Sequence, residues 1–136
     1  MKPPRVALSL KQPWAALVVH GLKFIEIRRW ATERRGRIFI HASKTIDPRP
    51  EAWARVTDEV RPATSLLGGL VGTAEITGCI PYADLAAFRA DRILHFNEES
   101  WFQPPVMYGF SLAKAKPVAF RPVIGNIKFF PVGPLP

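Results

Sequence analysis

The sequence predicts an α+β fold, namely a small mixed β-barrel of five to six strands with short flanking helices. Strand-like segments of β-branched and aromatic residues alternate along the chain with short segments whose apolar residues have helical spacing. The 14 prolines make the connections stiff, and no internal repeat or linker is visible. Because 136 residues are enough for one core, we expect a single domain over residues 1–136.

The first two elements are a strand and a short helix. Residues 5–10 (RVALSL) alternate well enough to form the strand. Pro13 then stands where a helix can begin, because the first helical position needs no backbone donor. We expect that helix to end at Gly21 and to bury three apolar side chains on one face, those of Trp14, Leu17 and Val18.

Two strands follow the helix. KFIEIRRW (residues 23–30) has the period of two that is typical of a strand, with Ile25 and Ile27 on one face. The other face is charged and aromatic, as expected where a sheet borders a cleft, and it carries Phe24, Glu26, Arg28 and Trp30. RIFIHAS (residues 37–43) is the second strand, and we expect the two to pair antiparallel across the turn ATERRGR.

The rest of the chain continues this alternation. Proline near a helix start and apolar residues at helical spacing predict a surface helix over residues 47–60, with a buried stripe of Trp53, Val56 and Val60. GGLVGTAEITGCI predicts a long strand over residues 68–80. We then expect a short helix over residues 82–90 and an irregular loop or lid over residues 91–106. Two strands over residues 107–113 and 116–120 and a proline-spaced tail over residues 121–136 complete the chain.

Composition limits the classes of function. Nineteen Lys and Arg against eleven Asp and Glu give a net charge of +8, which favours anionic partners, although solubility alone can also explain it. The single cysteine, Cys79, excludes an internal disulfide and a cysteine-based zinc site. No apolar run approaches the ~20 residues of a membrane span, and the opening residues lack the apolar core of a secretory signal. We therefore expect a cytoplasmic protein without a membrane partner.

No metal or other cofactor is expected. The three histidines, His20, His41 and His95, lie far apart in the sequence without a paired spacing, and carboxylates are few. No phosphate-binding loop, dinucleotide glycine pattern or serine nucleophile elbow is present.

One short segment concentrates charge in apolar surroundings. Lys23, Glu26, Arg28 and Arg29 lie within seven positions of a stretch that is otherwise typical of a core. Charged side chains are rarely buried unless they are paired. The cluster is therefore either a structural ion pair or the floor of a binding site.

Three motifs identify a family resemblance. The sequence contains S-x-x-Q-P-W-A, G-x-K-x-x-E-x-R-x-W and R-G-x-x-x-I-H-A, in this order, over residues 8–44. Together they resemble the ASCH domain, the activating signal cointegrator homology family, whose fold is like that of PUA RNA-binding domains. The resemblance implies a β-barrel with a cleft beside the helix after the first strand, suited to RNA or a modified nucleotide.

The residues around that cleft suit such a ligand. Lys23 can meet a phosphate as a point charge, Arg28 can donate two parallel hydrogen bonds, and Glu26 can accept from an exocyclic amine. Trp14 and Trp30 can stack on bases. The candidate nucleic-acid-binding residues are Lys11, Trp14, Lys23, Glu26, Arg28, Trp30, Arg35, Arg37, His41 and Lys44.

Each of these roles has a structural alternative. Glu26 with Lys23 or Arg28 can be an ion pair that only holds the fold together. Trp14 can be the core anchor of its helix, and His41 a satisfied core histidine. The basic turn with Arg34, Arg35 and Arg37 can be solvated, or it can meet a phosphate backbone. A protein-interaction module with a structural ion-pair motif is therefore one alternative function.

Hydrolysis is the other alternative. Some small members of the family are amidohydrolases of acylated cytidine that use a lysine, a threonine and a glutamate, and nuclease activity has been attributed to bacterial members. Lys23 matches the lysine, but Glu26 stands at the threonine position, so the hydroxyl is absent. A catalytic centre would use Lys23 and Glu26, with Glu98, Glu99 and His41 as weaker candidates for proton transfer. The sequence leaves open whether the chain is an enzyme, and also its oligomeric state.

Overall fold

The computed structural model describes residues 4–133, which form one mixed sheet and several short helices. The first half of the chain contains β1 (Val6–Leu10), α1 (Trp14–Val19), β2 (Ile25–Arg28), β3 (Gly36–Ala42), α2 (Pro50–Trp53) and the 3-10 helix η1 (Arg61–Ser65). The second half contains β4 (Gly69–Tyr82), α3 (Leu85–Ala90), α4 (Arg92–His95), the 3-10 helix η2 (Glu99–Trp101), β5 (Met107–Pro122) and β6 (Phe129–Pro131).

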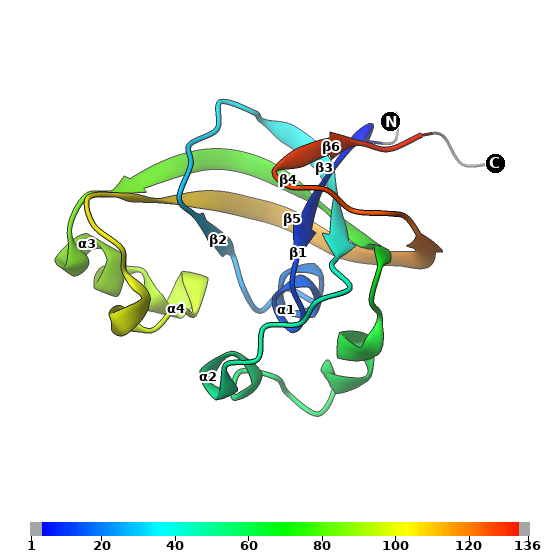
Figure 1. Cartoon of the computed structure of the whole chain (residues 1–136), viewed down its shortest axis with the longest axis horizontal. Helices are drawn as coiled ribbons and strands as arrows, with labels where there is room; N and C mark the ends of the chain where they lie inside the picture. Colours follow the sequence, from blue (N-terminus) through cyan, green and yellow to red (C-terminus); the bar gives the residue numbers. More distant parts are fainter. Residues whose placement is uncertain (1–3, 134–136) are drawn as a thin grey trace.

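The sheet is open rather than closed into a barrel. Its strand order is β2-β5-β4-β3-β1-β6, so the edge strands are β2 and β6. The predicted mixed arrangement of five to six strands with short helices is confirmed as a sheet of six strands, but the closed barrel is not. A closed barrel needs its first and last strands to pair, and the edge strands here are only 4 and 3 residues long. Figure 1 shows the long strands β4 and β5 bending through the molecule, with α3 and α4 gathered at one of their ends.

The predicted antiparallel pairing of the strands over residues 23–30 and 37–43 is wrong. β2 pairs antiparallel with β5, whereas β3 pairs antiparallel with β4 and parallel with β1. A parallel pair needs a crossover of a dozen or more residues. The segment between β1 and β3 provides that crossover, and it carries both α1 and β2. β2 thus reaches the far edge of the sheet instead of forming a hairpin.

Helix α1 is buried on every side. All six of its residues are buried, not only the predicted face. The helix packs on β3, β4 and β5 and is also covered by η1. Its approach to the sheet depends on Gly72 of β4, because a Cβ atom there would lie 2.3 Å from Cγ1 of Val19. The helix therefore fixes the position of the segment that leads into β2.

Several predicted boundaries change. The surface helix expected over residues 47–60 is restricted to α2, and the segments at 107–113 and 116–120 form one continuous strand, β5. The expected irregular loop over residues 91–106 contains α4 and η2. The tail adds β6 beside β1, and its last residues, 134–136, lie outside the described part of the chain. The helices α4 and η2 have 4 and 3 residues and are too short to leave a helical period in the sequence.

Candidate functional site

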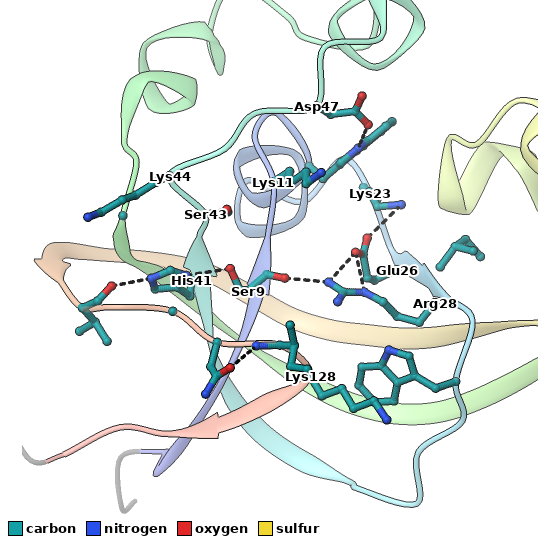
Figure 2. A pocket seen from close by; sticks show the side chains of 18 of the residues that line it. Ser9, Lys11, Lys23, Glu26, Arg28, His41, Ser43, Lys44, Asp47 and Lys128 are labelled. Carbon is teal, nitrogen blue, oxygen red and sulfur yellow. Dashed lines mark hydrogen bonds and ion pairs between the residues drawn. The ribbon is translucent and has the colours of Figure 1, made fainter.

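A cleft of about 1050 Å³ opens beside α1, and side chains from distant parts of the chain line it (Figure 2). The walls come from β1, α1, β2, the segment from the end of β3 to residue 49, and the loop at 123–128. The cleft brings together most of the residues predicted as nucleic-acid-binding, namely Lys11, Trp14, Lys23, Glu26, Arg28, Trp30, His41 and Lys44.

Glu26 lies on the floor of the cleft between two cations. Its Oε2 accepts hydrogen bonds from Nε and Nη2 of Arg28, at 3.1 and 2.9 Å. Its Oε1 lies 3.5 Å from Nζ of Lys23. The period of two in β2 puts Glu26 and Arg28 on the same face of the strand. The predicted ion pair between them is therefore present, and it lines the cleft as well.

Lys23 is a fully buried cation, with only 1% of its side chain exposed. Its Nζ donates a hydrogen bond to the carbonyl of His95, at 2.5 Å, and lies 4.9 Å from the ring centroid of Trp14. Burial lowers the pKa of Lys23 to about 8, against the opposing effect of the Glu26 carboxylate. The amine is therefore much closer to losing its proton at neutral pH than an exposed lysine is.

His95 supports Lys23 from the segment that the sequence assigned to a loop or lid. Its Nε2 donates to the carbonyl of Phe88, at 2.7 Å, and its Nδ1 accepts from the backbone N–H of Asn97, at 2.9 Å. Burial lowers the pKa of His95, so the imidazole is neutral in the folded chain. This segment forms a packed wall behind Lys23.

Side chains cross the open part of the sheet. Nη2 of Arg28, on β2, donates to the carbonyl of Ser9, on β1, at 2.8 Å, although these strands are not neighbours in the sheet. Trp30 packs edge-to-face on Phe110 of β5 and on Phe129 of β6, with ring centroids 5.1 and 5.6 Å apart. The two sides of the open sheet are thus held together by side chains, and the cleft lies between them.

A second carboxylate borders the cleft at Asp47. Oδ2 of Asp47 accepts from Nε1 of buried Trp14, at 2.8 Å, and both oxygens accept from the guanidinium of Arg49. Burial alone would raise the pKa of Asp47, but the bonds from Arg49 and Trp14 outweigh it and lower the pKa to about 2. The guanidinium of Arg49 also lies 3.5 Å from the ring centroid of Trp101. Asp47 and Arg49 were not among the predicted site residues, although they repeat the acid-x-Arg spacing of Glu26 and Arg28.

Three exposed lysines surround the mouth of the cleft. Lys11 follows β1, Lys44 follows β3, and Lys128 precedes β6. Nζ of Lys128 lies 5.3 Å from the ring centroid of Trp30, and the stem of Lys44 packs against Gly68. The mouth of the cleft is therefore positively charged, whereas its floor holds a carboxylate.

A serine and a histidine meet on the opposite wall. Oγ of Ser9 lies 2.9 Å from Nδ1 of His41, and Nε2 of His41 donates to the carbonyl of Val123, at 2.7 Å. His41 is buried, with 2% exposure, and its ring lies edge-to-face on Phe130. Both of its ring nitrogens thus have partners, as a satisfied core histidine requires, yet one of those partners is a hydroxyl in the cleft.

Four of the predicted residues lie outside the lining of the cleft. Arg35 is exposed and donates to the carbonyls of its own turn, while Arg37 donates to Oγ1 of Thr73, at 2.6 Å. The weaker catalytic candidates form ion pairs elsewhere, Glu98 with Arg92 and Glu99 with Arg89, each at 2.7 Å. Nothing in the geometry joins these four residues to Lys23 and Glu26.

Neither a metal cluster nor a membrane helix is found over residues 4–133. This part of the chain has no group of three or more His, Cys, Asp or Glu side chains that could hold a metal ion. It also has no helix that is long and apolar enough to cross a membrane.

The described residues thus form an α+β domain, an open mixed sheet with a cleft beside its first helix. The chain belongs to the ASCH domain family, whose family model matches residues 8–119. The fold is similar to the crystal structure of ASCH from Zymomonas mobilis, at 19% identity and a TM-score of 0.61 over 87% of this chain and 73% of that one. A mutant of the same protein gives a TM-score of 0.62 at 19% identity, over 89% of this chain and 77% of that one.

Two curated relatives match a part of the chain. "Activating signal cointegrator 1" of Mus musculus is 35% identical over 81 residues, and the human protein of that name is 33% identical over 82 residues. The match covers 54% of this chain but only 14% of each relative. What this chain shares with them is therefore the domain, and the activity of the whole relatives does not transfer with it.

Proposed function

We propose that the cleft beside α1 binds single-stranded RNA or a nucleotide. The observation that carries this proposal is the convergence of Lys11, Lys44 and Lys128, from three separate segments, on the mouth of one cleft. When surface lysines neutralise phosphates, the counterions condensed on the nucleic acid are released, and this release supplies a large share of the binding affinity. The net charge of +8 and membership of a family linked to nucleic acids agree with this proposal.

The interior of the cleft suits a base. Trp30 is partly exposed at the wall, so its ring can stack on a base once Lys128 moves from it to a phosphate. Glu26 and Arg28 supply an acceptor and a donor side by side on the floor. Trp14 has the smaller part in stacking, because it is 7% exposed, faces Lys23 and anchors α1. The proposed pose places phosphates outside and a base inside.

The experiment compares two triple variants of equal charge. Binding of a labelled single-stranded oligoribonucleotide is measured over a salt series. Replacement of Lys11, Lys44 and Lys128 by alanine should weaken binding and lower the slope of log K against log salt by about 2, since each phosphate contact on a single strand contributes about 0.7. The control variant replaces Arg35, Lys114 and Lys116, which are exposed but lie outside the cleft.

The control variant should retain most of the wild-type affinity. Equal losses in the two variants would show that binding is a property of the net charge and not of the cleft. An affinity that stays constant between low and physiological salt would contradict phosphate contacts altogether.

Hydrolysis at the same floor is a second candidate function. The observation that favours it is the lowered pKa of Lys23, about 8, beside Glu26 at 3.5 Å, because perturbed pairs of this kind serve as acid and base in enzymes. An acylated cytidine and an RNA strand should be offered to the wild type and to Lys23→Ala and Glu26→Gln. Turnover that disappears in both variants, while thermal melts show them to be folded, would support an enzyme, and equal turnover in all three proteins would point to another site.

A further inference from the structure

The wall of the cleft opposite Lys23 contains an arrangement that the RNA-binding proposal does not use. Ser9 of β1 and His41 of β3 face each other in the parallel ladder, and their side chains meet at 2.9 Å. Both residues line the cleft. Figure 2 shows Ser9 between His41 on one side and Arg28 on the other, with the hydroxyl bonded to the imidazole and the carbonyl bonded to the guanidinium.

The hydrogen bonds define which nitrogen of His41 can accept a proton. The carbonyl of Val123 can only accept, so Nε2 of His41 carries the hydrogen in their 2.7 Å bond. In the neutral imidazole, Nδ1 is then the acceptor, and the hydroxyl of Ser9 donates to it. A hydroxyl that donates to an imidazole, which is itself oriented by a third group, is the pattern of an activated nucleophile.

The imidazole is held rigidly in this orientation. Its ring lies edge-to-face on Phe130, with centroids 5.4 Å apart. Gly125 also packs against the ring, so closely that a Cβ atom at position 125 would lie 2.5 Å from Cε1 of His41. Rotamers locked by packing are what a catalytic base requires. The partly exposed Ser9 remains accessible from the cleft, whereas His41 lies behind it.

We propose that Ser9 is a nucleophile activated by His41, and that the cleft hydrolyses carboxylic esters whose alcohol part carries a phosphate. The choice of a phosphate-bearing alcohol rests on the proposed function, because the lysines at the mouth would hold that phosphate. The guanidinium of Arg28, bonded to the carbonyl of Ser9 at 2.8 Å, supplies positive charge beside the reacting group. The nucleophile itself depends only on Ser9 and His41.

The reaction has two halves. Oγ of Ser9 gives its proton to Nδ1 of His41 and forms a bond to the ester carbonyl carbon, and the tetrahedral oxyanion then breaks the bond to the alcohol oxygen, which leaves with the proton from Nδ1. In the second half, water gives a proton to Nδ1 and attacks the acyl-serine. The carboxylic acid is released, and Oγ takes its proton back from Nδ1. No other reactant than water is needed.

The first arm of the experiment is covalent labelling, which requires no nucleotide. The intact protein is treated with a fluorophosphonate, which reacts with activated serines, and the modified residue is identified by peptide mass spectrometry. The wild type should be labelled at Ser9, and Ser9→Ala should not be labelled. Ser43 is the matched control, because it lines the same cleft but its hydroxyl accepts from the N–H of Thr45. Ser43→Ala should be labelled at the wild-type rate.

His41→Gln should slow the labelling by about 100-fold or more, because that is the usual contribution of a general base. A thermal melt shows whether this variant is folded. If it is not folded, the comparison of labelling between the wild type and Ser9→Ala tests the proposal without it. An unlabelled wild type, a label on Ser43, or unchanged labelling of folded His41→Gln would each overturn the proposal.

The second arm offers two esters, O-acetyl adenosine 5′-monophosphate and O-acetyl adenosine. The wild type should hydrolyse the phosphate-bearing ester at least about tenfold faster, and Ser9→Ala should hydrolyse neither. No hydrolysis of either ester, despite labelling at Ser9, would overturn the ester-hydrolase assignment. Equal hydrolysis of both would overturn the role of the phosphate. Loss of RNA binding in the lysine variants is measured separately, so failure of the proposed function is distinguishable from failure of this activity.

Discussion

Two carboxylates border the cleft, and each bonds the arginine two residues further along the chain. Glu26 bonds Arg28, and Asp47 bonds Arg49. The side chain of Arg28 is 20% exposed, whereas that of Arg49 is 45% exposed. Glu26 also faces Lys23, whose side chain is only 1% exposed. The same acid-x-Arg spacing therefore gives a buried network in one place and an accessible cation in the other.

The difference comes from the local backbone. On β2 the two side chains share one face of a strand, so the sheet and the wall behind Lys23 enclose them. Asp47 and Arg49 lie in the connection before α2, where Asp47 is fixed by Trp14 and the guanidinium remains at the surface. Removing one partner of a buried pair is costly to stability, whereas the partly exposed guanidinium of Arg49 can meet a ligand while it stays bonded to Asp47.

The largest expected effect is on stability at the buried network. Glu26→Gln removes the counter-charge of both Lys23 and Arg28, so the free energy of unfolding should fall by about 3–5 kcal/mol. Denaturant unfolding measures it. Glu75→Gln is the matched control, because Glu75 pairs with exposed Lys114 on the sheet and should cost no more than about 1 kcal/mol. Equal small losses would mean that the Glu26 network is not structural.

The second effect is a pH dependence carried by Lys23. Its pKa is about 8 in the folded chain and 10.5 when exposed, so the unfolded chain binds more protons between these values. The free energy of unfolding of the wild type should therefore rise relative to Lys23→Met as the pH increases from about 8 to about 10.5, by about 3 kcal/mol in total. Curves that stay parallel over this range would show that Lys23 keeps an ordinary pKa in the fold.

The smallest effect on stability is expected at the accessible cation. Arg49→Met should lower the free energy of unfolding by about 1–3 kcal/mol, because buried Asp47 loses the guanidinium but keeps the bond from Nε1 of Trp14. It should also lower the salt slope of oligoribonucleotide binding by about 0.7, the contribution of one phosphate contact. Arg61→Met is the control, since Arg61 pairs with exposed Asp58 outside the cleft. Identical binding by both variants would remove Arg49 from the interface.

The local elements could be predicted from the sequence, but their pairing could not. β1, α1, β3 and β4 follow from periodicity, proline and glycine, which are properties of neighbouring residues. β2 pairs with β5 because the crossover through α1 carries it to the far edge of the sheet. No pattern among neighbouring residues predicts this pairing. Barrel closure fails for the same reason, since it depends on how two short edge strands meet.

The candidate site shows the same division. Lys23, Glu26 and Arg28 could be predicted, because a charged face on an otherwise apolar strand is visible in the sequence. The partners from elsewhere, the carbonyl of His95 and the loop at 123–128, are brought in only by the fold. The acid-x-Arg spacing of Asp47 and Arg49 is visible in the sequence, but these residues lie at the start of the helix predicted over residues 47–60, where charged residues are ordinary. The basic turn at residues 34–37 lies outside the lining of the cleft, because charge density alone does not show which direction a side chain takes.

Amide chemical-shift mapping shows whether the ligand occupies the cleft. A short single-stranded oligoribonucleotide is titrated into isotopically labelled protein. The largest shifts should arise on both sides of the cleft, at residues 9–11, 43–49 and 123–128, while residues 34–37 and 114–116 should change little. Shifts concentrated on the basic turn at 34–37, with an unperturbed cleft, would contradict the account.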